Sequence, residues 1–308
     1  MLKQMTVNSI IQYVNSIIQY IEENLESKFI NIDCLVLYSG FSRRYLQISF
    51  KEYVGMPIGT YIRVRRASRA AALLRLTRLT IIEISAKLFY DSQQTFTREF
   101  KKIFGYTPRQ YRMIPFWSFK GLLGRREINC EYLQPRICYL KERNIIGQCF
   151  NFRDLVFYSG IDSKCRLGKL YDSLKKNTAI TVSNRIPFHD KTNDIIARTV
   201  VWDRNKHFSD SEIKVDKGLY AYFFFNDTYD QYVHHMYNIY YNSLPIYNLN
   251  KRDGYDVEVI KRRNDNTIDC HYFLPIYCDD MEFYNEMQVY HNNIVKPEMS
   301  VTLGLPKS

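Results

Sequence analysis

Two ten-residue segments, one period of 50 residues apart, carry the side chains best suited to chemistry in this sequence. Residues 42–51 read SRRYLQISFK and residues 92–101 read SQQTFTREFK. Each begins with a serine suited to capping a helix, and each is followed four residues later by a glycine, Gly55 or Gly105. Arg, Gln, Ser and Thr on a helix face can bind base edges and phosphates of duplex DNA. The paired segments therefore predict two DNA-binding helices.

The donor and acceptor groups of each side chain indicate what it could contact. Gln can pair with adenine and Arg with guanine, while a Thr methyl group can touch a thymine methyl group. On the second segment, the candidates for base edges are Gln93, Gln94, Thr95, Thr97 and Arg98. The candidates for phosphates are Ser92, Lys101, Lys102 and Arg109. On the first segment, the candidates are Ser42, Arg43, Arg44, Tyr45 and Gln47, with Leu46 and Phe50 facing the core. Solvated polar helix faces are the alternative for either segment alone.

The residues before each segment predict the helix that positions it. A short amphipathic helix over 31–38 with a turn at 39–41 precedes the first segment, and 80–89 with a turn at 90–91 precedes the second. This order is the helix-turn-helix pattern. Residues 61–76 lack Gly and Pro, so they predict a rigid helix between the two units. Two units in one chain can reach successive major grooves, roughly 34 Å apart, so we expect a monomer to bind an asymmetric site.

A shorter repeat lies at the start of the chain, where VNSIIQY occurs at 7–13 and again at 14–20. Seven residues are two helical turns, so the repeat aligns one apolar helix face. That face comprises Ile10, Val14, Ile17, Ile18, Ile21 and Leu25. The repeat predicts a long first helix that packs on the core, and a dimerising seam is the alternative.

The composition predicts a globular protein of about two domains. The chain has 308 residues, of which 46% are hydrophobic and 24% charged, and this excludes a disordered or collagen-like chain. The net charge is +11, and residues 1–112 hold 17 Lys and Arg against 8 Asp and Glu. The later residues are nearly neutral and hold 17 of the 26 Tyr. We therefore expect a basic, DNA-binding domain followed by an aromatic domain.

Other features indicate where the protein works. No run of 18 apolar residues occurs, and the N-terminal stretch lacks the features of a signal peptide. The seven Cys include no CxxC pair, which favours reduced thiols. A cytoplasmic protein without a membrane segment is expected.

The later residues predict an α+β domain over 134–278, after a linker over 113–133 that packs on a neighbour. The expected strands are 136–140, 145–150, 219–225, 256–260 and 271–276, with helices near 167–174 and 229–240. The aromatic side chains could line an apolar ligand pocket or form an aromatic core. Residues 279–308 predict a partly ordered tail.

No enzyme is expected from the motifs present. GxGxxG, GxSxG and P-loop motifs are missing, so no cofactor is predicted. His234 and His235 are adjacent and would face different directions on a helix, unlike a zinc-binding pair. Cys270, His271 and Cys278 could bind a metal or sense oxidants, but buried thiols are the more frequent reading, and no metal site is predicted.

The chain resembles the AraC/XylS family of transcription regulators, and within it the MarA/SoxS/Rob subfamily. The resemblance rests on YIRVRRASRAAALLRLT (61–77), YDSQQTFTREFKKIFGYTPRQYR (90–112) and, with departures, GFSRRYLQISFK (40–51). The subfamily's first recognition helix carries Trp, Gln and Arg toward the bases. Here Gln47 is retained, but the other two positions are Arg44 and Ile48. The half-site read by the first helix should therefore differ or be read more loosely.

The resemblance also implies the overall plan: an all-α domain with two helix-turn-helix units over 1–112, then an α+β GyrI-like domain. KERNIIGQ (141–148), SLPIYNLNKRDGYDVEVI (243–260) and HYFLPI (271–276) carry the second part of the match. The implied partners are double-stranded DNA, RNA polymerase and a small lipophilic, often cationic, effector. The resemblance implies Glu258 as an effector-binding residue, and the aromatic strand and helix add Tyr222, Phe224 and Tyr237 as candidates.

One departure from the family pattern and several alternatives accompany this prediction. Where the family tends to carry Glu after the aromatic strand, this chain has Asn226, and Glu258 could instead be an exposed residue of an edge strand. An architectural DNA-binding protein with weak sequence preference is the second reading, and it predicts equal affinity for all sequences with a steep salt dependence. A GyrI-like hydrolase is the third.

Overall fold

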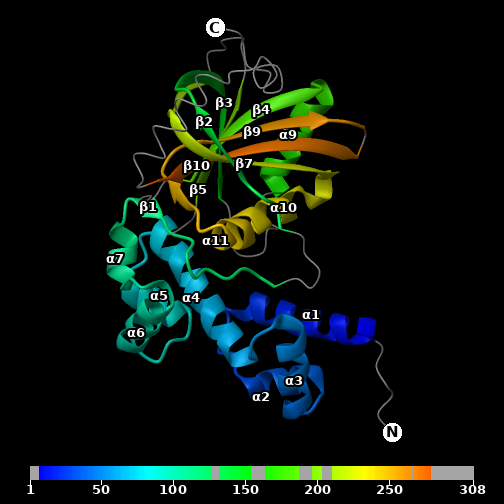
Figure 1. Ribbon diagram of the computed structural model, residues 1–308, viewed down its shortest axis with the longest axis vertical. Coiled ribbons are helices and arrows are strands. Elements are labelled where there is room, and N and C mark those ends of the chain that lie inside the picture. Colours follow the sequence, from blue (N-terminus) through cyan, green and yellow to red (C-terminus); the bar gives the residue numbers. More distant parts are fainter. Residues whose placement is uncertain are drawn as a thin grey trace.

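The computed structural model describes residues 7–126, 132–153, 164–186, 196–202, 210–264 and 266–278. Its first part is helical and its second part is a sheet with helices, as Figure 1 shows. The helices of the first part are α1 (Val7–Asn24), α2 (Ile32–Ser39), α3 (Arg43–Val54), α4 (Ile58–Leu76), α5 (Ile81–Lys87), α6 (Gln93–Phe104) and α7 (Pro108–Met113). The predicted tail, 279–308, and part of the predicted linker, 127–131, lie outside the described residues.

The first recognition unit has a core of its own. The apolar face of α1 is buried as its spacing predicts, since Val14, Ile17 and Ile21 are fully covered. They pack with Leu46 and Phe50 of α3 and with the start of α4. The seven-residue repeat therefore builds an internal packing face, with Ile10 half-buried, and this favours packing on the core over the dimerising seam.

Helix α4 connects the two recognition units. With 19 residues it is about 28 Å long. Figure 1 shows α2 and α3 near one end of α4 and α5 and α6 near the other. The sheet lies above the helical part in this view. The predicted helix over 61–76 is confirmed, and its side chains are buried along most of its length.

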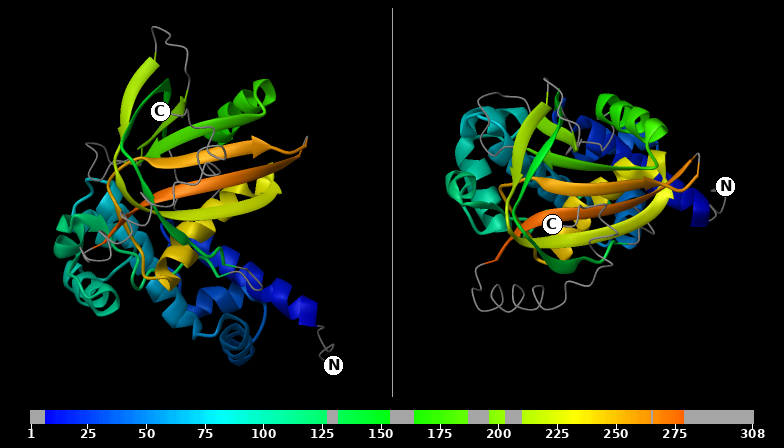
Figure 2. Two further views of the ribbon diagram at one scale, coloured as in Figure 1. Left: turned by 45° about the horizontal axis from the view of Figure 1, so that its top comes forward. Right: turned by 90° about the horizontal axis from the view of Figure 1, so that it is seen from above.

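The second part is a curved antiparallel sheet, seen from two sides in Figure 2. Its strands are β2 (Arg136–Leu140), β3 (Arg143–Arg153), β4 (Ala179–Arg185), β5 (Ile196–Trp202), β6 (Asp210–Val215), β7 (Gly218–Thr228), β8 (Asn250–Arg252), β9 (Asp256–Arg262) and β10 (Thr267–Tyr277). The short β1 (Phe116–Trp117) joins its margin through β8. The order is β1-β8-β10-β9-β4-β5-β3-β6, and β7 pairs with β10 and β2.

The helices of the second part follow the predicted positions. They are α9 (Lys164–Lys176), α10 (Tyr232–Asn238) and α11 (Leu244–Ile246), with the 3₁₀ turn η1 (Tyr229–Gln231) before α10 and the π-helical turn η2 (Ile239–Ser243) after it. The α+β architecture is confirmed, and each expected strand is present. Pro275 lies in β10 beyond the last residue paired with β9, so its missing N–H breaks no bond on that side.

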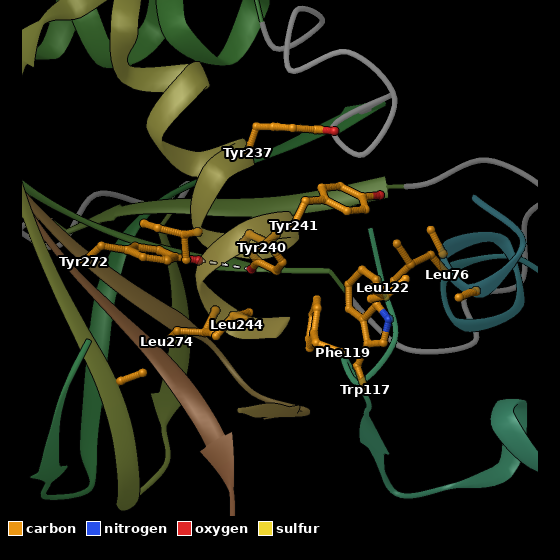
Figure 3. Close-up of a cluster of buried hydrophobic side chains, with 14 of the residues drawn as sticks. Leu76, Trp117, Phe119, Leu122, Tyr237, Tyr240, Tyr241, Leu244, Tyr272 and Leu274 are labelled. Carbon is orange, nitrogen blue, oxygen red and sulfur yellow. Dashed lines mark hydrogen bonds between the residues drawn. The ribbon is translucent and has the colours of Figure 1, made fainter. Parts of the chain in front are cut away.

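The two parts share a hydrophobic core, shown in Figure 3. Leu76 of α4 packs with Trp117 and Phe119 of the linker, and these meet Tyr240 of η2. A Cβ atom on Gly124 would lie 2.5 Å from Cβ of Tyr241, so the linker needs glycine at this close approach. The linker thus packs on its neighbour, as predicted. In the described part of the chain, no helix is both long and apolar enough to cross a membrane.

Candidate nucleic-acid interface

The two recognition helices are built in the same way. Ser42 and Ser92 cap α3 and α6 by accepting hydrogen bonds from the backbone N–H three residues later, at 3.3 and 3.1 Å. Gly55 and Gly105 end the helices with φ of +81° and +79°, a conformation that favours glycine. Local sequence signals therefore fix both ends of each helix.

Burial divides each recognition helix into an inner and an outer face. Leu46 and Phe50 in α3, and Phe96 and Phe100 in α6, are fully buried. The exposed candidates are Ser42, Arg43, Arg44, Gln47, Gln93, Gln94, Arg98, Lys101, Lys102 and, at the start of α7, Arg109. The half-buried candidates are Tyr45, Ser92, Thr95 and Thr97. The structure thus brings the predicted side chains of each unit to one solvent-facing surface.

Several candidates also have partners inside the protein. Arg43 forms an exposed ion pair with Asp33 of α2. The ring of Tyr45 stacks on Phe41 with 5.1 Å between centroids. The hydroxyl of Ser92 donates to that of Thr95 at 3.1 Å. These contacts orient the recognition surface, so these residues combine positioning with any contact to DNA.

Part of the basic excess of the first 112 residues is structural. Arg65, Arg69 and Arg75 of α4 are each at most 5% exposed. Arg65 and Arg69 pair with Glu22 and Glu26, and Arg75 donates to backbone carbonyls at the end of α7. Burial lowers the pKa of Arg75 to about 10, so it remains charged at neutral pH. These side chains do not contribute to the interface, which the basic composition alone could not reveal.

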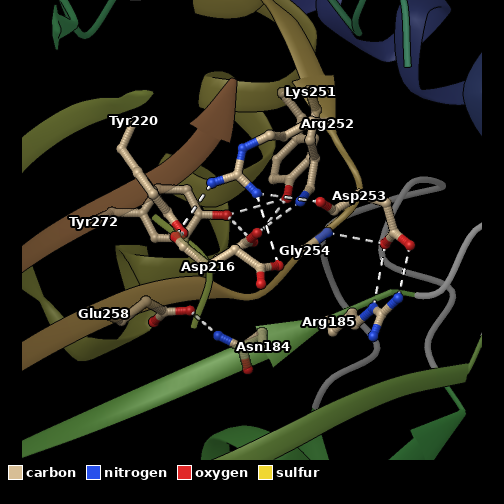
Figure 4. A network of polar contacts seen from close by, with 12 residues as sticks. Asn184, Arg185, Asp216, Tyr220, Lys251, Arg252, Asp253, Gly254, Glu258 and Tyr272 are labelled. Atoms are coloured by element: carbon tan, nitrogen blue, oxygen red, sulfur yellow. Dashed lines mark hydrogen bonds and ion pairs between the residues drawn. The ribbon is translucent and has the colours of Figure 1, made fainter. Parts of the chain in front are cut away.

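The predicted effector residue Glu258 lies in the middle of the sheet and not on an edge. It is 2% exposed and accepts hydrogen bonds from Tyr232 of α10 and from Asn184 of β4, the latter drawn in Figure 4. The reading of Glu258 as an exposed edge residue is therefore wrong, because β9 pairs with both β4 and β10.

A second buried carboxylate lies next to Glu258. Asp256 accepts from Lys251 Nζ at 2.7 Å, from Tyr240 Oη at 3.0 Å, and from Tyr272. Burial, with the charge of Asp256, raises the pKa of Tyr240 and Tyr272 well above the ordinary value of 10.0. Both hydroxyls therefore stay protonated and donate. Sequence analysis missed this network because its members come from separate strands and η2.

The other predicted effector residues do not join Glu258. The register places Tyr222 opposite Phe273, and Phe273 opposite Val257. Successive strand residues face opposite sides, so Tyr222 faces away from the side of Glu258. Phe224, 43% exposed, lies on the same side as Tyr222.

Tyr237 lies at the junction between the two parts, where its hydroxyl accepts from the backbone N–H of Arg125. One pocket lined by all four predicted residues is thus not present. Asn226, which stands where the family tends to carry Glu, donates to Asp269 Oδ1 at 2.6 Å.

The histidines and cysteines of the second part form no metal centre among the described residues. His234 contacts Asn238 and His235 contacts Asp227, each at 2.9 Å, so the two rings point to different partners as expected. Cys270 is fully buried.

Comparison with known proteins identifies the family. Residues 35–113 match the family described as a helix-turn-helix domain, and residues 133–277 match the GyrI-like small molecule binding domain. The chain is 98% identical over 308 residues, the full length of both chains, to the F1 operon positive regulatory protein of Yersinia pestis. The chain belongs to the AraC family of transcription regulators. It is an AraC-type DNA-binding regulator with a C-terminal GyrI-like domain.

More distant relatives match only part of this chain. The HTH-type regulator YkgA of Escherichia coli is 37% identical over 171 residues, 54% of this chain and 67% of its own. The regulator Rob of Salmonella typhimurium is 45% identical over 93 residues, 30% of this chain and 32% of its own. The solved C-terminal domain of AraT from Geobacillus stearothermophilus matches 32% of this chain and 83% of its own, with 31% identity and a TM-score of 0.32.

Proposed function

We propose that this protein activates transcription by binding an asymmetric DNA site as a monomer, with α3 in one major groove and α6 in the next. The observation that carries the proposal is the pair of identically capped, outward-facing helices near the two ends of α4. A rigid spacer fixes their separation, so two half-sites need no second protein molecule.

The relative of 98% identity suggests the target. Its name states that it positively regulates the F1 operon, and we assign the same role to this chain. A positive regulator acts on RNA polymerase, which is the expected protein partner. A protein that acts on bacterial DNA works in the cytoplasm.

The C-terminal domain is the proposed receptor for a small lipophilic effector. The match to the GyrI-like small molecule binding domain supports this role. The buried carboxylate of Glu258 would favour a cationic molecule, since a buried charge is stabilised by an opposite charge. The tyrosines around it offer apolar rings with hydroxyl groups as polar contacts.

The first experiment selects bound duplexes from a random pool with the full-length protein. The winning duplex and a scrambled one are then titrated by fluorescence anisotropy at 50 and at about 200 mM salt, a range over which phosphate contacts lose most of their affinity. An asymmetric consensus with two elements about one helical turn apart, saturated by one molecule per duplex, is the expected result.

Two outcomes contradict the proposal. If no consensus emerges and all duplexes bind equally with a steep salt dependence, the protein is architectural. If two molecules are needed per site, the recognition helices of one chain do not span both grooves. A truncated duplex that carries only the element read by α6 is the matched control, and it should bind more weakly than the complete site.

A further inference from the structure

The internal repeat places an isoleucine where its counterpart has an arginine. Residues 42–51 align with 92–101 without a gap, so Ile48 in α3 corresponds to Arg98 in α6. The buried apolar residues Leu46 and Phe50 correspond to Phe96 and Phe100, and the capping serines and glycines correspond as well. Ile48 and Arg98 therefore take the same place in their recognition helices.

Ile48 is exposed, and its neighbours on the helix face are polar. Its side chain is 55% exposed, although an isoleucine is ordinarily buried. Arg44, Gln47 and Lys51 lie four, one and three residues away, and all are exposed. Residues three or four apart share a helix face, so Ile48 lies within the polar stripe formed by Arg44 and Lys51.

On the basis of the proposed function, we infer that Ile48 reads DNA by apolar contact with the C5-methyl group of a thymine. In the major groove, thymine alone among the four bases presents a methyl group. Arg44 and Lys51 on the same face can bind phosphate or guanine and so hold the helix in the groove. The two recognition helices then use different chemistry at equivalent positions: a methyl contact from Ile48 and hydrogen bonds from Arg98.

Replacement of thymine by uracil tests this contact, because uracil lacks only the methyl group. Each thymine of the selected duplex is replaced singly by deoxyuridine, and the Kd of the full-length protein is measured for each duplex. At least one replacement should raise the Kd about fourfold, the factor expected when one methyl group stays in water. That replacement should leave the Kd of Ile48→Ala unchanged.

Two further variants complete the experiment. Leu37→Ala removes an apolar side chain of α2 that is 86% exposed, and this variant should show the same uracil effects as the wild type. Ile48→Arg should change the preference at the responding position from thymine to guanine.

The inference is overturned if the wild type and Ile48→Ala respond identically to uracil at every position, including no response at all. In that case a consensus with high affinity still supports the proposed function. Failure to select any consensus would instead refute the proposed function itself, so the two failures can be told apart. A loss that persists in Ile48→Ala belongs to another side chain, such as Thr97.

Discussion

The buried ion pair between Arg65 and Glu22 is the basis for a quantitative prediction. Arg65 Nε donates to Glu22 Oε1 at 2.8 Å and its Nη2 lies 2.5 Å from Oε2, with both residues at most 5% exposed. A third nitrogen of Arg65 donates to the carbonyl of Leu123, and the guanidinium lies 5.6 Å from the ring centroid of Tyr241. Arg65 therefore joins α1, the linker and η2.

Arg65→Met should lower the free energy of unfolding by about 3–5 kcal/mol, because Glu22 would remain as a buried charge without its opposite charge. The remaining donor is the hydroxyl of Tyr61, 2.9 Å from Glu22 Oε1. The double variant Arg65→Met/Glu22→Gln removes both charges and keeps an acceptor for Tyr61. Since the loss of an entire buried pair is often nearly neutral, the double variant should recover most of the stability.

The assay is urea unfolding at 25 °C, followed by far-ultraviolet circular dichroism and by tryptophan fluorescence, which includes buried Trp117 at the junction. Arg43→Met is the control, because its ion pair with Asp33 is 56% and 64% exposed and should contribute less than about 1 kcal/mol. A loss below about 1 kcal/mol for Arg65→Met, or a double variant as unstable as the single one, would refute the reasoning.

Three further predictions concern DNA affinity and acid stability. Arg98→Ala should cost about 1–3 kcal/mol at the selected site and little on scrambled DNA, and equal losses on both would exclude base recognition. Lys102→Ala should reduce the slope of log K against log salt by about 0.9 on any duplex, and an unchanged slope would exclude a phosphate contact. For Glu26, burial raises the pKa, but Arg69 and Lys87 outweigh it, so the pKa lies below its ordinary value of 4.5. This carboxylate therefore stabilises the fold above about pH 4.5, and the stabilisation is lost as the pH falls further. The variant Glu26→Gln should therefore lose less stability in acid than the wild type. Parallel profiles of unfolding free energy against pH for the two proteins would contradict this.

The recognition units could be predicted because their signals are local. A capping serine, a buried pair three or four residues apart, and a terminal glycine all lie within fifteen residues, and the period of 50 doubles each signal. The role of the α4 arginines could not be predicted in this way. The carboxylate partners of Arg65 and Arg69 are 43 residues earlier in the chain, and helix periodicity does not indicate which basic residue is buried.

Sequence analysis missed β4, β5, β6 and β8, and β4 shows one reason, since it contains buried polar residues. In β4, Ser183 accepts from Trp202 Nε1 at 2.9 Å, and Asn184 donates to Glu258 and accepts from Thr199. Ser and Asn ordinarily favour turns, and here they occupy buried positions where an apolar residue would have indicated a strand.

The four predicted effector residues do not lie together in the structure, and the sequence could not show this for a related reason. Alternation along β7 shows that Tyr222 and Phe224 share a face, but which face α10 covers depends on tertiary packing. The spacing of the residues likewise predicted a helix near 229–240 without indicating that the linker contacts Tyr237.

The packing of α10 and η2 determines how the proposed effector could influence DNA binding. Tyr232 and Tyr240 contact the buried carboxylates of the sheet, whereas Tyr241, the residue after Tyr240, faces Arg65. The unit that contains α6 shares its core with the sheet, but the unit that contains α3 has a separate core. A shift of α10 would therefore act directly on the α6 unit, and the α3 unit would follow through Arg65 and through α4, which belongs to both cores. It follows that an effector bound at Glu258 would move the two recognition helices together relative to the sheet, because α4 keeps their separation, and would leave each helix intact. Because coupling between two sites is reciprocal, the complete DNA site should then alter effector affinity, and a duplex with only one element should alter it less.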